Sequence, residues 1–260
     1  MSKPILDDEL LDYYSRQIKL PQLGEEGQAR LYGSRALIIG MGGLGSPVAM
    51  YLAAAGIGNI TVSDFDRVEA SNLQRQIVHR ARDIGALKAH SAKATLQELN
   101  PHAKVTAVDW ELDEDELQRH VEAADVVVDC SDNFATRFAL NTACFRHRTP
   151  LVSGAAIRFE GQVSTFLPED PDSPCYRCLY PDSDAAAETC PAEGILAPVV
   201  GIIGSIQALE AVKVLGGLGR TLCGRLLLVD ALSMECHTIR LPKDAACPVC
   251  GDRAPPAPGK

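Results

Sequence analysis

Short apolar runs alternate with longer amphipathic segments along most of the chain. The amphipathic segments show helical periodicity over about 45–55, 86–99, 113–123 and 134–147. The apolar runs have the length and flanking residues of strands, and they cover 36–40, 59–64, 104–110, 125–130 and 150–154. Strands that alternate with helices of this length predict an α/β fold, with a Rossmann-like, mostly parallel sheet covered by helices on both faces.

The pattern changes after Gly154. Segments 161–167, 224–232 and 235–241 alternate between apolar and polar residues, so we expect antiparallel strands that continue the sheet. Residues 168–194 are rich in Pro, Asp and Ser and predict a long loop near an active site. The apolar segment 197–217 that follows predicts a helix that is mostly buried.

A helix is predicted near the N-terminus, over residues 7–20, with Asp7 or Asp8 as its cap. We therefore divide the chain into an N-terminal helical segment (1–30), one α/β domain (31–252) and a disordered tail (253–260).

Charge and composition narrow the classes of function. A net charge of −9 argues against a nucleic-acid-binding surface. No apolar run is long enough to predict a membrane span, and the first residues lack the layout of a signal peptide. Together with nine cysteines, these features predict a cytoplasmic protein in a reducing compartment.

The turn after the first predicted strand is rich in glycine. Gly40-x-Gly42-x-x-Gly45 fits the dinucleotide fingerprint, and the helix that follows directs its N-terminal N–H groups at a phosphate. Asp64 ends the second strand, where a carboxylate reaches a ribose hydroxyl. The turn predicts a nucleotide site, with NAD, FAD and other nucleotides all open.

Polar and charged side chains gather just beyond the second strand. They are Asp64, Asp66, Asn72, Arg75, Gln76 and Lys88. A nicotinamide ring needs few ionic groups, whereas a triphosphate needs cations to neutralise it. Asp132 follows the fourth strand at the same edge of the sheet, and a carboxylate beside a polyphosphate indicates Mg²⁺ between them. The alternative for each single charge is a solvated surface residue.

Six motifs follow one another in order along residues 10–252: GMGGLGSP, SNLQRQ, DCSDN, SGAA, CYRCL and CPVCG. In this order they resemble the MoeB, ThiF and HesA family of adenylyltransferases, bacterial relatives of ubiquitin-activating enzymes. The resemblance implies that 31–252 is an ATP-binding domain. It implies adenylation, with Mg-ATP and release of pyrophosphate, of the C-terminal Gly-Gly carboxylate of a ubiquitin-like sulfur carrier (MoaD-like or ThiS-like), for molybdopterin or thiamine thiazole synthesis. The alternatives are an NAD- or FAD-dependent oxidoreductase and a non-catalytic scaffold subunit of an activating heterodimer.

The same resemblance implies roles for single residues. The implied catalytic residues are Arg16, Arg75, Lys88 and Asp132. The implied ATP-binding residues are Gly40, Gly42, Gly43, Gly45, Asp64, Asp66, Asn72, Arg75, Gln76, Lys88 and Asp132. Arg16 would reach the γ-phosphate of a neighbouring subunit's ATP, which implies a homodimer. Sulfur would come from a separate sulfurtransferase or cysteine desulfurase.

The nine cysteines divide into three groups. Two CxxC pairs, Cys175, Cys178, Cys247 and Cys250, have the spacing of a closed, structural Zn²⁺ site. Cys130 and Cys144 lie in apolar segments and are predicted to be core residues, while Cys223 and Cys236 lack context. Cys190 lies in the polar loop, and the resemblance implies a part in sulfur transfer; the alternative is an incidental loop cysteine.

Overall fold

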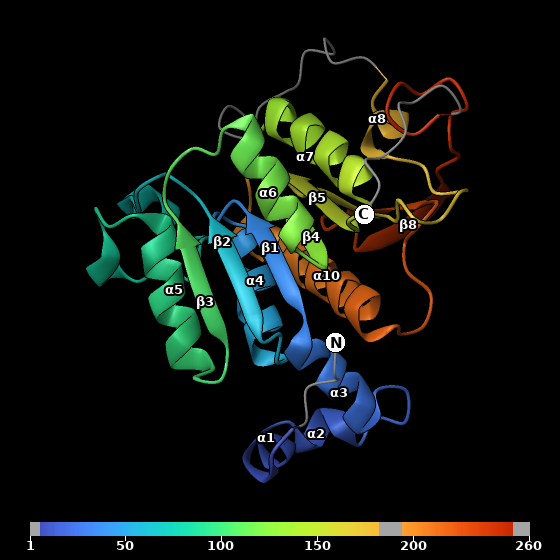
Figure 1. Cartoon of the computed structure of the whole chain (residues 1–260). Coiled ribbons are helices and arrows are strands. Elements are labelled where there is room, and N and C mark those ends of the chain that lie inside the picture. Colours follow the sequence, from blue (N-terminus) through green and yellow to red (C-terminus); the bar gives the residue numbers. More distant parts are fainter. Residues whose placement is uncertain (1–5, 182–193, 252–260) are drawn as a thin grey trace.

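The computed structural model describes residues 6–181 and 194–251, and one eight-stranded sheet forms its centre (Figure 1). The strand order is β3-β2-β1-β4-β5-β6-β7-β8. The strands are β1 (Arg35–Ile39), β2 (Asn59–Ser63), β3 (Lys104–Val108), β4 (Val126–Asp129), β5 (Leu151–Ile157), β6 (Glu160–Phe166), β7 (Arg225–Asp230) and β8 (Glu235–Arg240).

The sheet has a parallel part and an antiparallel part, as the sequence predicts. Strands β3, β2, β1, β4 and β5 are parallel neighbours. From β5 onward each pair is antiparallel, through β6 and β7 to the edge strand β8. Strand β5 runs to Ile157, three residues beyond the predicted end, because it pairs along its whole length with β6. The predicted fold class is confirmed.

Helices cover both faces of the sheet. In Figure 1, α6 and α7 lie in front of the strands and α10 passes behind them. The helices are α1 (Asp8–Tyr13), α2 (Ser15–Ile18), α3 (Gly24–Gly33), α4 (Gly45–Ala54), α5 (Lys88–Leu99), α6 (Glu114–Ala123), α7 (Phe134–His147), α8 (Tyr176–Leu179) and α10 (Ala197–Gly216). Two 3₁₀ turns, η1 (Ala70–Asn72) and η2 (Ala81–Asp83), lie between β2 and α5.

Strand β1 shows why the central strands read as continuous apolar runs. Ile38 faces the core cluster shared with α4, α5 and α10, while Leu37 and Ile39 face the cluster shared with α6 and α7. Because successive side chains point to opposite faces, a strand covered on both sides must be apolar at every position.

Helix α10 is buried on one face only, which differs from the prediction. By length and composition it is apolar enough to cross a membrane, with a mean hydropathy of 1.6, yet it packs on β4, β5, β6 and α4. Half of it is buried, and Leu209 on its outer face is 58% exposed. The outer face has no covering element among the described residues.

The N-terminal segment differs from the prediction in two ways. The predicted helix 7–20 is interrupted at Tyr14, whose buried hydroxyl accepts a hydrogen bond from Asn100 Nδ2 at 2.8 Å. Asp7 is the cap of α1, through its carboxylate and the Leu10 N–H. Helix α3 has no counterpart among the predicted elements, and it runs across residue 30, where we place a boundary. The division of the chain at residue 30 stays a prediction. Residues 252–260, which include the predicted tail, lie outside the described residues.

Candidate functional site

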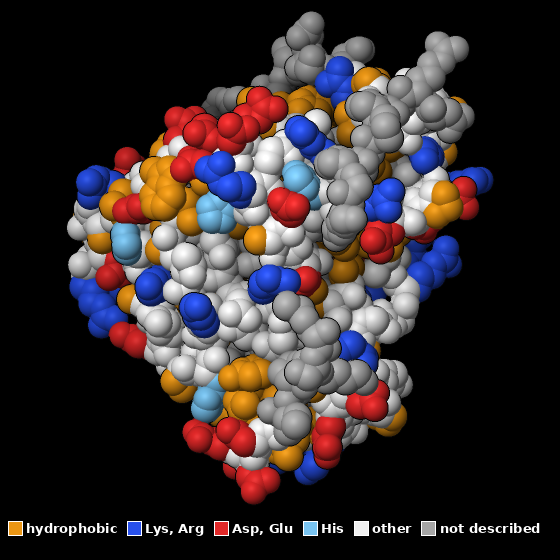
Figure 2. All heavy atoms as spheres, in the orientation of Figure 1, with side chains coloured by type: hydrophobic (Ala, Val, Ile, Leu, Met, Phe, Trp, Pro, Cys, Tyr) orange, Lys and Arg blue, Asp and Glu red, His pale blue; other side chains and the backbone are white. Residues whose placement is uncertain are grey.

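A cavity of about 590 Å³ opens at the carboxyl ends of β1, β2 and β4. Open α/β sheets bind ligands at this edge. Its wall contains the glycine turn, the end of β2, part of the segment between β2 and α5, and the start of α7. Figure 2 shows the side of the molecule that α6 and α7 cover, and basic and acidic side chains are interspersed over it.

The glycine turn brings backbone rather than side chains to the cavity. Gly40, Gly42 and Gly43 line it. Gly40 has a φ of +90°, which favours glycine, and a Cβ on Gly45 would lie 1.9 Å from the Gly40 carbonyl oxygen. Helix α4 begins at Gly45 and has no side-chain cap. The Ser46 N–H donates to the Gly42 carbonyl and Pro47 has no N–H, so the Gly45 N–H is the one at this helix end that is available to an anion.

The charged side chains of Asp64 and Asp66, just after β2, and of Lys88, at the start of α5, form one connected group. Asp64 accepts hydrogen bonds from the Met41 N–H at 2.7 Å and the Asp66 N–H at 2.9 Å. Lys88 is buried at the start of α5, and its Nζ lies 2.8 Å from Asp66 Oδ2. The Lys88 ammonium thus points to the cavity while it is paired with a carboxylate that is mostly exposed. An anionic ligand would take the place of a weak, solvent-screened partner.

The start of α7 forms the opposite wall. Asp132 is exposed and lines the cavity, and Asn133 caps the helix by accepting from the Thr136 N–H at 2.9 Å. The carboxylates of Asp64, Asp66 and Asp132 face the same space as Arg75 and Lys88. Carboxylates and cations together suit a magnesium nucleotide better than a bare anion.

Below this wall lies a buried polar network that the sequence did not predict. Asp129 is 1% exposed and accepts from the Ser131 N–H at 3.0 Å, the Ser131 hydroxyl at 2.6 Å and the Ser153 hydroxyl at 2.9 Å. Arg137 lines the cavity and donates to the Ser131 carbonyl at 2.7 Å and to the Tyr176 hydroxyl at 3.3 Å. Burial raises the pKa of Tyr176 to about 12. The network fixes the backbone that leads to Asp132.

Most of the predicted ATP-binding residues line this one cavity, and their binding roles stay predictions. The predicted residues that line it are Gly40, Gly42, Gly43, Asp64, Asp66, Arg75, Gln76, Lys88 and Asp132. Gly45 instead packs behind the turn. The Asn72 side chain accepts from the Glu69 N–H and belongs to the cap of η1. Arg16 is exposed on α2 and forms no hydrogen bond or ion pair within residues 6–181 and 194–251, and Cys190 lies outside those residues.

The cavity also has an apolar side that sequence reasoning missed. Phe65 and Trp110 line it and are 55% and 48% exposed, respectively. Leu112 and Leu117 lie on the same wall. Phe65 follows β2 and Trp110 follows β3, so both lie at the carboxyl edge of the sheet. Their positions at the carboxyl ends of two predicted parallel strands could have identified them from the sequence. Such a wall suits a planar base.

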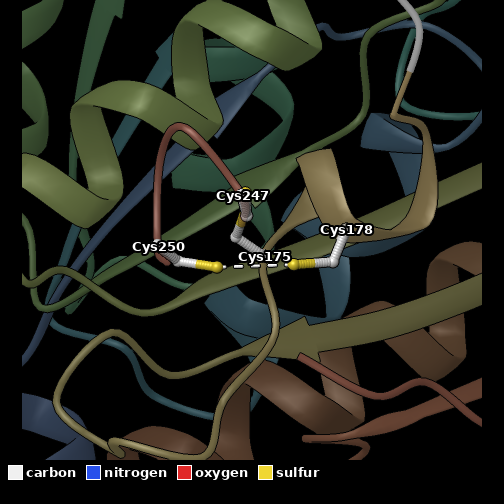
Figure 3. A group of neighbouring side chains, drawn as sticks. All are labelled: Cys175, Cys178, Cys247 and Cys250. Atoms are coloured by element: carbon white, nitrogen blue, oxygen red, sulfur yellow. Dashed lines mark hydrogen bonds between the residues drawn. The ribbon is translucent and has the colours of Figure 1, made fainter. Parts of the chain in front are cut away.

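A cluster of four cysteines joins two distant parts of the chain (Figure 3). Cys175 and Cys178 lie at α8, Cys247 and Cys250 lie in the loop after β8, and all four sulfur atoms lie within 4.8 Å of one another. Cys175 Sγ is 3.6 Å from Cys247 Sγ, and Cys178 Sγ is 3.4 Å from Cys250 Sγ. Sulfur atoms bound to one tetrahedral Zn²⁺ at ~2.3 Å are about 3.8 Å apart. The donor set and its spacing therefore fit zinc.

The environment of the cluster favours a thiolate, the form that binds metal. Hydrogen bonding, above all with Cys250, lowers the pKa of Cys175 to about 6. The same contact raises the pKa of Cys250. The Asp244 N–H also donates to Cys178 Sγ at 3.4 Å. With four sulfur ligands and no open position, such a metal would be structural.

The remaining described cysteines lie apart from this cluster. Cys130 and Cys144 are buried as predicted, and burial raises the pKa of both thiols well above the ordinary value. Cys223 is half-buried and Cys236 is exposed on β8.

Comparison with known proteins connects this architecture to a family. The ThiF family matches residues 14–249. The chain is 45% identical over 246 residues to the molybdopterin-synthase adenylyltransferase of Escherichia coli K12, covering 95% of this chain and 98% of that protein. It is 44% identical over 238 residues to the sulfur carrier protein ThiS adenylyltransferase of the same organism, covering 92% and 94%.

Among solved structures, a complex of E. coli MccB with MccA-N7isoAsn superposes with a TM-score of 0.80 at 24% identity, over 92% of this chain and 75% of that one. That likeness supports the fold alone. The family match and the two relatives span nearly all of this sequence, and the chain therefore belongs to the ThiF family.

Proposed function

We propose that this protein is an adenylyltransferase that transfers AMP from ATP to the C-terminal Gly-Gly carboxylate of a small ubiquitin-like sulfur-carrier protein. One observation carries the proposal: a glycine turn, three cationic side chains and four carboxylates line one cavity at the carboxyl edge of the sheet. The relatives that match nearly the whole chain are named as adenylyltransferases.

The reaction needs positioning and electrostatics more than proton transfer. A carboxylate oxygen of the carrier attacks the α-phosphorus of ATP and forms an oxygen–phosphorus bond, which gives an acyl adenylate. The bond between the α-phosphorus and the oxygen that bridges to the β-phosphorus breaks, and pyrophosphate leaves with that electron pair. The carrier's carboxylate is already ionised at neutral pH, so no general base is required. The protein must bring two anions together, and cationic groups lower the energy of that approach.

Several cavity residues have a part in this scheme. The N–H groups of the glycine turn and of Gly45 bind phosphate, Arg75 and Lys88 neutralise it, and Asp64 accepts a hydrogen bond from a ribose hydroxyl. Phe65 and Trp110 provide an apolar wall for adenine. Asp132 would hold Mg²⁺, which would offset the negative charge of the phosphates.

Supply of sulfur is a separate step. We assign it to a separate sulfurtransferase or cysteine desulfurase, and we assign Cys190 to that later transfer. The two relatives are named for different carriers, molybdopterin synthase and ThiS. Carrier-dependent exchange measured side by side with MoaD-like and ThiS-like proteins identifies the carrier, and with it the pathway.

We further propose a cytoplasmic homodimer in which Arg16 completes the partner's ATP site. Arg16 is exposed and lies outside the cavity wall of its own chain, so it is available to a second copy. Tyr51 on α4 and Leu209 on α10 are 57% and 58% exposed, and these two helices pack side by side. Large apolar side chains on adjacent helices suit a protein partner. A two-fold interface would place Arg16 of each subunit on the other.

Carrier-dependent ATP–pyrophosphate exchange tests the proposed activity. Lys88→Ala should reduce the exchange rate by about 10²-fold or more, because it removes charge at the transferred phosphate. Lys93→Ala is the matched control, since Lys93 lies on the same helix but not on the cavity wall, and it should exchange at the wild-type rate. Equal rates in the two variants, or exchange that does not require a carrier, would contradict the assignment.

A further inference from the structure

His79 is a buried residue of the segment between β2 and α5, and the proposed chemistry leaves it without a role. It is 4% exposed and lies outside the cavity wall. Its two ring nitrogens contact different parts of the chain. Nε2 lies 3.0 Å from the Met41 carbonyl oxygen, and Nδ1 lies 2.8 Å from Ser91 Oγ. His79 therefore connects the glycine turn to α5.

We propose that His79 is a positioning residue. By holding the Met41 carbonyl on one side of the peptide group, it turns the Gly42 N–H on the opposite side toward the nucleotide phosphate. This role rests on the proposed function, because the phosphate is that of ATP. The Met41 carbonyl and the Gly42 N–H belong to one planar, trans peptide group, so they point in opposite directions. With the carbonyl directed at the buried ring, the N–H is directed away from it.

The surroundings of Gly42 agree with an N–H that serves a ligand. Gly42 lines the cavity, and its N–H donates no hydrogen bond within the described part of the chain. A Cβ at Gly42 would meet only Gln76 Nε2, at 3.6 Å. Peptide N–H groups in such a turn are the usual donors to phosphate oxygens.

The peptide on the other side of Met41 is held as well. The Met41 N–H donates to Asp64 Oδ2 at 2.7 Å. Both peptide groups of Met41 are thus fixed by side chains, one from the end of β2 and one from the segment beyond it. The Met41 side chain is itself fully buried, so the turn cannot rotate about this residue without breaking buried contacts.

The contact with the Met41 carbonyl sets the tautomer of the ring. A carbonyl oxygen only accepts, so the Met41 contact requires a proton on Nε2. Ser91 Oγ, on α5, donates to Asp83 Oδ2 at 3.0 Å and lies 2.8 Å from Nδ1. Burial lowers the pKa of His79, with Lys88 adding to that effect and Asp64 and Asp83 opposing it. In the neutral ring the one proton lies on Nε2, which donates it to the Met41 carbonyl.

Binding of ATP and of adenosine to four variants tests this role. His79→Leu removes both contacts at similar size. His79→Gln keeps a donor near the position of Nε2, whereas His79→Asn reaches only the position of Nδ1. Thr95→Val is the matched control, because it deletes one buried hydrogen bond, from Thr95 Oγ1 to the carbonyl of the neighbouring Val78 at 2.8 Å.

His79→Leu and His79→Asn should bind ATP about tenfold or more weakly, while their affinity for adenosine, which has no phosphate, stays near the wild-type value. His79→Gln should restore ATP binding. Thr95→Val should lower the melting temperature without weakening ATP binding. The comparison of His79→Gln with His79→Asn keeps the test decisive if His79→Leu fails to fold.

Three results would overturn the role of His79 alone, provided that wild-type protein binds ATP more tightly than adenosine. They are unchanged ATP binding by His79→Asn, equal losses of ATP and adenosine affinity, and a Thr95→Val variant that loses as much ATP affinity as His79→Asn. Wild-type protein that binds ATP no better than adenosine would contradict the proposed function and the role of His79 together.

Discussion

Replacement of Gly45 by alanine tests the packing behind the glycine turn. Gly45 is the first residue of α4, and alanine in place of glycine inside a helix ordinarily stabilises a protein by up to about 1 kcal/mol. Here a Cβ would lie 1.9 Å from the Gly40 carbonyl oxygen and 2.9 Å from its carbon. The turn and the helix would have to separate by about 1.5 Å to reach an ordinary contact of 3.4 Å.

We expect Gly45→Ala to lower the free energy of unfolding by about 3 kcal/mol, the upper part of the range for overpacking, because both clashing groups are backbone. For a chain of this size that is a fall in melting temperature of about 6–12 °C. Thermal unfolding followed by circular dichroism measures it, with ATP binding recorded for the same samples.

Two other glycines are matched controls for this change. Gly201 lies in α10 with nothing within 4 Å of a Cβ, so Gly201→Ala should raise the melting temperature slightly. Gly42→Ala should leave the melting temperature near the wild-type value but weaken ATP binding, because its methyl group would occupy the cavity edge. A Gly45→Ala protein as stable as Gly201→Ala would refute the reasoning.

Three further predictions concern the metal, the pH and the assembly. Metal analysis should give about one zinc per chain, and Cys247→Ala should lose the zinc and melt at a lower temperature; a zinc-free wild-type protein of equal stability would contradict the site. Burial lowers the pKa of His79 from its ordinary value of 6.5, so as the pH falls this histidine takes up a proton in the unfolded chain before it does in the folded one. The free energy of unfolding should therefore decrease below about pH 6.5. It should decrease less in His79→Gln. If both proteins lose the same stability, His79 is not responsible. Mixing Arg16→Ala with Lys88→Ala should restore exchange activity through heterodimers with one intact site; heterodimers without activity would place Arg16 outside the partner's site.

The order of strands and helices could be predicted because their apolar patterns are local. Residues 36–39 and 126–128 are apolar at every position, which only a strand covered on both faces requires. Helix α3 was missed because its sequence, GEEGQARLYG, contains three glycines and little apolar periodicity, and tertiary contacts hold it in place. The first helix is interrupted at Tyr14, whose hydroxyl accepts a hydrogen bond from Asn100, a residue distant in sequence.

The candidate site was predictable where a motif marks a strand end. Asp64 and Asp132 follow β2 and β4, and parallel strands bring their carboxyl ends together. Arg137 and Tyr176 were not predictable, because they come from α7 and α8 and meet only in the folded chain. His79 belongs to the same class, since its partners Met41 and Ser91 lie far away along the sequence. Contacts of this kind depend on packing rather than on pattern.

The intact mass of a carrier protein after incubation with this enzyme, Mg-ATP and pyrophosphatase tests adenylation most directly. A ubiquitin-like carrier that ends in Gly-Gly should gain the mass of one AMP moiety. The same carrier without its last glycine should gain none, and neither should the complete carrier with the Asp132→Asn enzyme. A Gly-Gly carrier that keeps its original mass with every MoaD-like and ThiS-like protein tried, while the wild-type enzyme binds ATP, would contradict the account.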